Sequence, residues 1–309
     1  PTLWDAGCRT FFVAYLHEAV ALRALLPEAV IYVFHGLDPD DVDELRRLRL
    51  RPVLNSPEEL TFTRGAQLEP AIHVDTGMQR LGFGVEHLPL LEAFLAEEPV
   101  PLLMSHLASA DQAKNAMNTI QLQRFQELET AFRGRVPAFS LANTAGVMLG
   151  SAFHFDLTRP GIGLYGGSPD PNEAAGFEPV AIWHASVLQI CTLAPGTPVG
   201  YGGSYITDSE QTVVTLSTGY ADGYLRALSN RAVVSVNGFD LPVIGRVSMD
   251  LITVDATALV ADGQRIQRGD WVELMGGAVT VDRLAKESGT IGYEILTRLG
   301  SRLERQVVR

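Results

Sequence analysis

The first half of the chain alternates short apolar runs with longer segments in which apolar residues recur at helical spacing. A short apolar run bounded by turn residues is typical of a buried β-strand, and alternation with helices predicts βα units around a parallel sheet. The predicted strands span residues 10–14, 29–34, 51–54, 71–75, 102–107, 138–142 and 154–157. We therefore expect seven βα units within residues 1–176.

Helical segments lie between these runs, and several begin with Asp, Ser or Asn, which are favoured at helix N-termini. They are HEAVALRALL, DPDDVDELRRL, SPEELTFTRG, EHLPLLEAFLAEE and NTIQLQRFQELETAF. A closed barrel of this type contains eight strands, because an open seam would leave unpaired backbone at its edges. We therefore predict an α/β fold, a (β/α)8 TIM-type barrel with seven of its eight units visible in this sequence, and we expect the first unit upstream of residue 1.

From about Gly176 onward the pattern changes to β-branched runs separated by Gly, Pro and Asp. The runs WHASVLQICTL, QTVVTLSTG, RAVVSVNG, LPVIGRVSMDLITVDA and DWVELMGG are typical of strands joined by turns. VDRLAKESG and GYEILTRLG, near the end, have the spacing of short helices. We therefore predict that residues 177–309 form a second, mostly antiparallel β domain that packs tightly against the first.

Composition argues against several classes of partner. The 309 residues include 24 basic and 36 acidic ones, and the net charge of -12 opposes binding to nucleic acid or to an anionic membrane. Cys8 and Cys191 lie far apart in the sequence and suggest no disulfide framework, which favours a reducing compartment. Because no apolar stretch reaches about 20 residues, we expect a cytoplasmic protein that does not enter the membrane.

Polar residues follow several apolar runs, where the carboxyl ends of parallel strands meet at one rim. Arg80, His106 and Arg159 occupy such positions, as does the pair Asn143 and Thr144. The turn RPGIGLYGG, which begins at Arg159, contains four glycines that let backbone amides approach an anion. A phosphate suits this turn, although a tight connection between two domains would also require glycines.

Seven motifs follow one another along the chain. They are HVDTGMQRLGF (73–83), SHLASAD (105–111), SLANTAG (140–146), RPGIGLYGG (159–167), VGYGGSY (199–205), STGYADGYLR (217–226) and GRVSMDLITVD (245–255). In this order they closely resemble alanine racemase, a fold-type III enzyme that uses pyridoxal 5'-phosphate, over nearly the whole chain. The resemblance implies interconversion of L- and D-alanine without a metal ion, D-alanine supply for peptidoglycan, and a homodimer with shared active sites.

The resemblance also assigns residues to the cofactor. Arg159 is similar to the arginine that faces the pyridine nitrogen. Because arginine is effectively always protonated, that nitrogen stays unprotonated, which favours proton removal and return over transamination. The amides of Gly161 and Ile162 and the Thr144 hydroxyl resemble the phosphate donors, with Asn143 beside them. By the same resemblance, His106 lies behind Arg159 and the catalytic tyrosine and holds both in register.

Racemisation requires acid–base groups on both faces of the substrate α-carbon. Tyr201 in VGYGGSY resembles the family's tyrosine base, which the partner subunit contributes. Arg80 resembles the arginine that contacts the substrate carboxylate, and a planar guanidinium suits that role. Met249 and Asp250 resemble the pair whose methionine amide meets the same carboxylate, and Tyr220 resembles a residue of the entry corridor.

Two departures from the family pattern are visible. Family members attach the cofactor as a Schiff base to a lysine in a segment resembling VVKADAYG, whereas the only lysines here, Lys114 and Lys286, have no matching context. We expect that lysine in an upstream segment, and a chain without it would be inactive. His73 stands where many members carry a carbamylated lysine that orients the arginine corresponding to Arg80. An imidazole cannot form that carbamate, so His73 acts through an anion or water, or has no such role.

The sequence leaves three alternatives open. A non-catalytic cofactor-binding or regulatory homologue would explain the absent lysine, but retention of Tyr201, His106 and Arg159 favours an enzyme. A broad-specificity amino-acid racemase would share these residues, because residues that tune specificity lie partly in the expected upstream unit. A decarboxylase of the same fold would need a different carboxylate environment from the one that Arg80 and Met249 imply.

Overall fold

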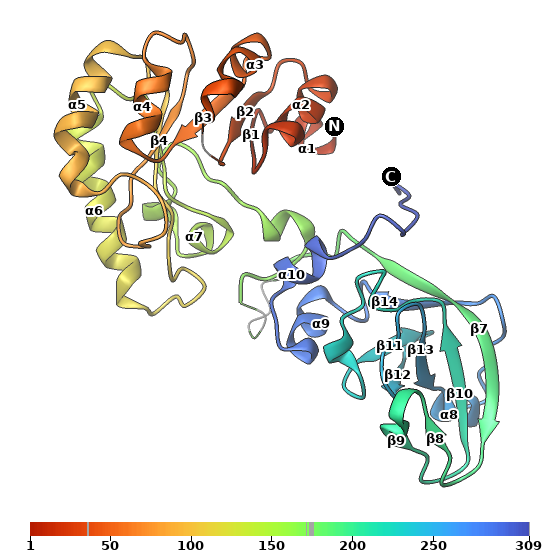
Figure 1. Cartoon of the computed structure of the whole chain (residues 1–309). Helices are drawn as coiled ribbons and strands as arrows, with labels where there is room; N and C mark the ends of the chain where they lie inside the picture. Colours follow the sequence, from red (N-terminus) through yellow and green to blue (C-terminus); the bar gives the residue numbers. More distant parts are fainter. Residues whose placement is uncertain (36, 171, 173–175, 309) are drawn as a thin grey trace. The chain divides into compact units, whose positions relative to one another are not determined.

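The computed structural model describes residues 1–35, 37–170, 172 and 176–308. The chain forms two compact units, Pro1–Pro160 and Gly161–Arg309 (Figure 1). The division follows Pro160, whereas the sequence pattern changes near Gly176. Each unit contains its own hydrophobic core.

Unit 1 is built on a six-stranded parallel sheet whose neighbouring strands follow one another in the sequence. The strands are β1 (Thr10–Val13), β2 (Val30–Val33), β3 (Arg51–Leu54), β4 (Ala71–His73), β5 (Leu102–Met104) and β6 (Ala138–Ser140). Thr10 is opposite Val30 at one edge, and Met104 is opposite Ser140 at the other. These strands confirm the first six predicted runs.

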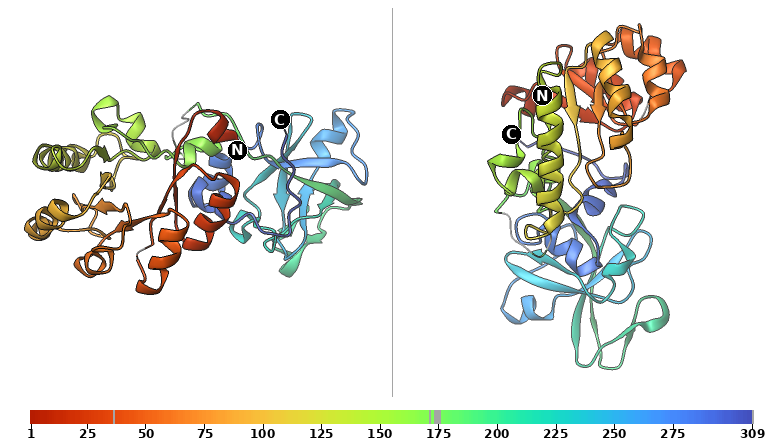
Figure 2. Two further views of the ribbon diagram at one scale, coloured as in Figure 1. Left: turned by 90° about the horizontal axis from the view of Figure 1, so that it is seen from above. Right: turned by 90° about the vertical axis from the view of Figure 1, so that its left-hand side faces the viewer.

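Helices α2 to α6 connect the strands and form a layer along one face of the sheet, as the view from above shows (Figure 2). The helices of this unit are α1 (Thr2–Asp5), α2 (Leu16–Leu25), α3 (Val42–Arg47), α4 (Pro57–Thr63), α5 (Leu88–Glu97), α6 (Ala116–Phe132) and α7 (Thr144–Met148), with 3-10 turns at Pro39–Asp41, Val85–His87 and Ser151–Phe153. Ser56 opens α4 in a capping box with Glu59, and Asn115 caps α6. No helix in the described ranges combines the length and hydrophobicity of a membrane span.

Both faces of the parallel sheet are buried. Ile31 and Val33 face the helices and belong to the main core. Tyr32, between them, points to the other face, where it packs in a smaller cluster with Val53, Ala71, Leu102 and Met104. Burial on both faces explains why these strands read as continuous apolar runs rather than as alternating ones.

The seventh predicted strand, residues 154–157, was a wrong assignment. Phe155 has a left-handed backbone with φ 53°, and a 3-10 turn precedes it, so the run bends instead of extending. Beyond this bend, Asp156 N and Leu157 N both donate to Phe139 O of β6, and Arg159 N donates to Ala142 O, just after β6, at 2.8 Å. The described sheet is therefore an open half-barrel of six strands, and the bent segment places Arg159 at the end of β6.

Unit 2 is a closed β-barrel with the strand order β10-β13-β12-β11-β14-β7 (Figure 1). The barrel strands are β7 (Trp183–Leu193), β10 (Gln211–Leu216), β11 (Val233–Val236), β12 (Phe239–Ile244), β13 (Ile252–Asp255) and β14 (Trp271–Met275). The other elements are β8 (Pro198–Val199), β9 (Tyr205–Ile206), α8 (Thr257–Ala261), α9 (Val281–Ser288) and α10 (Gly292–Thr297), with 3-10 turns at Ile162–Tyr165, Tyr201–Gly203 and Arg226–Leu228. All barrel pairings are antiparallel, which confirms the predicted character of this part of the chain.

Candidate active site

Five predicted site residues lie in unit 1, after the carboxyl ends of β4, β5 and β6. They are Arg80, His106, Asn143, Thr144 and Arg159. The register places His73, Met104 and Ser140 side by side at the ends of these strands. Because parallel strands share one carboxyl edge, the structure gathers these residues at one rim.

The Arg159 guanidinium is surrounded by neutral acceptors. One nitrogen donates to Ser105 O at 2.6 Å and to Leu141 O at 3.4 Å, and another contacts the Ser140 hydroxyl. No carboxylate of the described residues forms an ion pair with it. Burial lowers the pKa of Arg159 to about 10, so the side chain remains a cation at neutral pH. A desolvated cation without a counter-charge is a candidate for binding a ligand acceptor.

Two imidazoles near Arg159 are held neutral. Burial, followed by the positive charge of Arg159, lowers the pKa of His106 to about 3. The same two causes lower the pKa of His73 to about 4, with Asp75 opposing the shift. The charge of Arg80 contributes to both shifts, so its guanidinium acts on both rings. The rim therefore presents arginine cations and neutral imidazoles at pH 7.

Asn55 determines which nitrogen of His73 carries the proton. Asn55 Nδ2 donates to Val53 O at 2.8 Å, which leaves Asn55 Oδ1 as an acceptor. His73 Nδ1 lies 2.9 Å from that oxygen and must donate to it, so His73 Nε2 keeps a lone pair. His73, the departure from the family pattern, is therefore a buried neutral acceptor and not an anion.

Arg80 lies on a loop that is fixed at its base. The Asp75 carboxylate accepts from the three amides of residues 77–79, each at 2.8 Å. Phe83 N donates to His73 O at 2.8 Å and closes the loop against β4. Arg80 itself is exposed and has no hydrogen-bond or ion-pair partner among the described residues. Its fork of donors is available to a carboxylate.

The side chains of Asn143 and Thr144 occupy the start of α7. Asn143 Oδ1 accepts from Gly146 N at 2.9 Å and caps the helix. Thr144 is buried at the first helical position. Asn143 thus has a local structural role in addition to the cofactor contact predicted for it.

The glycines of the turn RPGIGLYGG (159–167) differ in what surrounds them. A Cβ at Gly166 would overlap Glu178 O, and a Cβ at Gly167 would lie 2.8 Å from the Ile162 side chain. These two glycines are therefore required by packing within unit 2. A Cβ at Gly161 would meet open space instead, and Ile162 beside it is buried. Gly161 is therefore the position of these at which the turn retains room for a ligand.

Tyr201 stands at an exposed tip of unit 2, between β8 and β9. The three glycines at positions 200, 202 and 203 have φ values of 70°, 68° and 53°, which form a tight turn around it. Its side chain is 71% exposed, and its hydroxyl has no partner within the described part of the chain. A guanidinium nitrogen of Arg246 would lie 3.4 Å from a Cβ at position 202, so a cation that we did not select from the sequence packs on this turn.

Tyr220, Met249 and Asp250 are brought together elsewhere in unit 2. Tyr220 N donates to Ser248 O at 3.0 Å, and the Gly219 backbone lies so close to Met249 that any Cβ would overlap the Met249 carbonyl. The Met249 amide has no acceptor among the described residues, whereas the Asp250 carboxylate accepts from Arg302 at 2.8 Å. Met249 is thus available to a ligand, and Asp250 is engaged in an ion pair.

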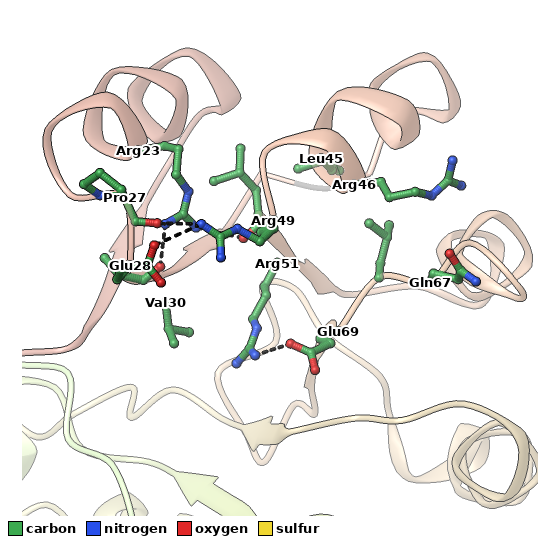
Figure 3. A pocket seen from close by; sticks show the side chains of 13 residues that line it. Arg23, Pro27, Glu28, Val30, Leu45, Arg46, Arg49, Arg51, Gln67 and Glu69 are labelled. Carbon is green, nitrogen blue, oxygen red and sulfur yellow. Dashed lines mark hydrogen bonds and ion pairs between the residues drawn. The ribbon is translucent and has the colours of Figure 1, made fainter.

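A separate pocket of about 360 Å³ lies at the amino ends of β2 and β3, at the opposite edge of the sheet from the rim (Figure 3). Four arginines line it, and their donors are already used. Arg23 donates to five carbonyl oxygens, Arg49 pairs with Glu28, and Arg51 pairs with Glu69. The arginines of this pocket bind backbone carbonyl oxygens and carboxylates of the protein itself. None of the predicted site residues lines the pocket.

Asn55 and Gln121 hydrogen-bond residues of the rim but were not selected from the sequence. Asn55 directly follows β3, which is the same kind of position as the selected rim residues occupy after later strands. Gln121 lies on the buried side of α6 with Phe125 and Leu128. A polar residue within an apolar helix stripe is the signal that identifies it.

Both parts of the chain match one family. The alanine racemase N-terminal domain matches residues 1–169, and the alanine racemase C-terminal domain matches residues 180–307. The chain belongs to the alanine racemase family. It is 43% identical to the alanine racemase of Methylobacterium nodulans, over 100% of this chain and 84% of that protein. It is 41% identical to a protein of Agrobacterium fabrum named as a catabolic alanine racemase, over 100% of this chain and 81% of that protein.

Alanine racemases of known structure share the fold. The Bartonella henselae enzyme superposes with a TM-score of 0.90 at 38% identity, covering 100% of this chain and 87% of that one. That structure contains covalently bound pyridoxal phosphate. The match confirms the predicted family and fold class. Both lysines of the present chain are exposed, Lys114 in the loop before α6 and Lys286 on α9.

The neutral histidines make the stability of this alanine racemase family member sensitive to acid. An imidazole titrates near pH 6.5 when unfolded, but the pKa of His106 in the folded chain is about 3. The unfolded state therefore binds more protons between these values, and the stabilisation present above pH 6.5 is lost as the pH falls towards 3. The free energy of unfolding should fall between pH 7 and pH 4. We expect this fall to be about 2–3 kcal/mol smaller in His106→Gln than in the wild type.

Urea unfolding at pH 7, 5.5 and 4 measures this effect. His184→Gln is the matched control, because His184 is exposed. Carboxylates titrate in all three proteins, so the difference between wild type and variant isolates the imidazole. Equal pH dependence in wild type and His106→Gln would contradict the assignment.

Proposed function

We propose that this chain is a pyridoxal-phosphate-dependent alanine racemase that interconverts L- and D-alanine. The observation that carries the proposal is the desolvated Arg159 cation, which donates to neutral oxygens at the strand ends and lacks a carboxylate partner among the described residues. A guanidinium in this setting suits an unprotonated ring nitrogen as an additional acceptor. Family membership along the whole chain supports the same reaction.

The residues present fit the cofactor. Arg159 would face its pyridine nitrogen, and Thr144 with the amides of Gly161 and Ile162 would bind its phosphate, supported by the Asn143 cap. When bound, pyridoxal phosphate withdraws electrons from the substrate and makes the proton on its α-carbon removable. Arg159 limits that withdrawal, because its own proton is not transferred at neutral pH and the pyridine nitrogen stays unprotonated.

The protein groups then position alanine and move its proton. Arg80 and the Met249 amide bind the carboxylate, while Asp250 anchors the Met249 turn and Tyr220 borders the entry. Tyr201 removes or returns the proton on one face of the α-carbon. His106, neutral beside Arg159, holds Arg159 in place without adding charge to the site.

The proposal includes a cytoplasmic homodimer that supplies D-alanine for peptidoglycan. An exposed tyrosine on a rigid glycine turn supports the dimer, because such a side chain needs another surface to become desolvated. We extend the first domain to residue 176 and begin the tyrosine-bearing domain at residue 177, which keeps the glycine turn with the cofactor site. Growth of a D-alanine-requiring bacterium carrying this gene tests whether the protein supplies D-alanine in a cell.

The activity is tested with the full-length protein supplied with pyridoxal phosphate and L-alanine. We expect chiral chromatography to show conversion to an equal mixture, because the two enantiomers have the same free energy. Serine assayed in parallel separates an alanine-specific from a broad-specificity racemase. A protein that binds the cofactor, as seen in its absorbance, but forms no D-amino acid would instead be a non-catalytic homologue.

A further inference from the structure

Gln121 is a fully buried polar residue that spans two loops of the rim. Its Oε1 accepts from Ala108 N at 2.8 Å, and its Nε2 donates to His106 O at 2.8 Å and to Thr76 Oγ1 at 3.1 Å. A glutamine amide has four hydrogen-bonding positions, and three of them are engaged here. One side chain from α6 therefore ties the segment after β4 to the segment after β5.

The contacts continue from Thr76 towards Arg159. Thr76 Oγ1 lies 2.7 Å from Ser105 Oγ, and both side chains are buried. The Ser105 carbonyl accepts from Arg159 at 2.6 Å. We name this chain of contacts through Gln121, Thr76 and Ser105 the Gln121 network. It ends on the guanidinium proposed to face the cofactor.

The Gln121 network also contacts the loop that carries Arg80. Thr76 lies in that loop, three residues after β4, and Arg124, one helical turn after Gln121 on α6, donates to Thr76 O at 2.9 Å. Arg80 has no partner of its own among the described residues, so its position depends on the loop backbone. The loop is held to α6 through Thr76 and to itself through Asp75.

We infer that Gln121 and Thr76 are positioning residues that hold Arg80 at a fixed distance from Arg159, so that the substrate carboxylate is bound in line with the reacting carbon. The inference rests on the proposed function and adds residues that do not touch the substrate. Its physical reason is that misplacement of a binding group by about 1 Å is enough to cost roughly a hundredfold in rate. A buried hydrogen-bond network that engages both ends of the Gln121 amide provides that rigidity.

The test uses two shape-conserving changes in the full-length holoenzyme. Thr76→Val removes the hydroxyl and keeps the volume, whereas Thr76→Ser keeps the hydroxyl. Gln121→Met removes all three hydrogen bonds, and Gln123→Met changes an exposed residue of the same helix. We measure kcat, the KM for alanine, the Ki of propionate as a carboxylate without an amino group, and the cofactor absorbance.

We expect Thr76→Val and Gln121→Met to raise the KM for alanine and the Ki of propionate about tenfold and to lower kcat, with cofactor absorbance retained. Thr76→Ser and Gln123→Met should stay within about twofold of wild type.

If both Thr76→Val and Gln121→Met fold, retain cofactor and leave KM and Ki unchanged, the positioning role is wrong. If Gln121→Met fails to fold, the Thr76 pair decides, because Val and Ser both fit the site. An inactive wild type would overturn the proposed function, whereas an active wild type with indifferent variants overturns only this inference.

Discussion

Tyr201→Phe should lower kcat for racemisation by about 10²–10⁴-fold while cofactor binding stays close to wild type, because the change removes only the hydroxyl that we propose transfers the proton. The exposed position of Tyr201 and its lack of a partner within the described residues mean that the fold loses no contact. Tyr205→Phe is the matched control. Tyr205 lies four residues away, and its hydroxyl accepts from Gln211 at 2.8 Å instead of facing solvent. Substantial activity in Tyr201→Phe would remove this residue from the mechanism.

The same variant tests whether active sites are shared between subunits. If each site combines Tyr201 of one subunit with Arg159 of the other, a mixture of inactive Tyr201→Phe and inactive Arg159→Glu proteins would rebuild one intact site per mixed dimer. With equal amounts and full exchange, half of the dimers are mixed and half of their sites are intact, which gives about a quarter of wild-type activity. Absence of recovery after verified subunit exchange would argue for sites formed within one subunit.

Arg159→Glu is the second change with a large expected effect. A carboxylate at this position would hold a proton on the ring nitrogen of the bound cofactor, and stronger electron withdrawal would permit transamination. We expect racemisation to fall by about 10²-fold or more and the ratio of pyruvate formed to D-alanine formed to rise. Pyruvate is measured with a coupled dehydrogenase, and D-alanine by chiral chromatography.

Arg159→Lys is the matched control for Arg159→Glu. It keeps a positive charge but loses the planar fork that reaches Ser105 O and the Ser140 hydroxyl together. We expect lower racemisation without an increased share of pyruvate. An unchanged product ratio in Arg159→Glu would show that this side chain does not govern the ring nitrogen.

Much of the fold follows from local sequence patterns. Each of the first six apolar runs becomes a strand, since a short run of apolar residues between turn signals has few other ways to bury both faces. The run at residues 154–157 fails for a local reason. Phe155 adopts a left-handed backbone, which side-chain pattern alone does not reveal. The strand order of the closed barrel in unit 2 likewise depends on pairings between strands that are distant in the sequence.

By itself, the sequence determined the family, the two-part organisation and the identity of the polar residues after each strand, because motifs and periodicity are local properties. Only the tertiary structure decided the contacts, solvation and protonation of the site residues. Arg159 finds Ser105 54 residues away, and Gln121 finds Thr76 45 residues away. Burial then keeps His73 and His106 neutral. The hydrogen bond from His73 Nδ1 to Asn55 leaves His73 Nε2 as an acceptor. Desolvation and proton placement depend on what surrounds a group in space, and neighbours in the chain do not supply that information.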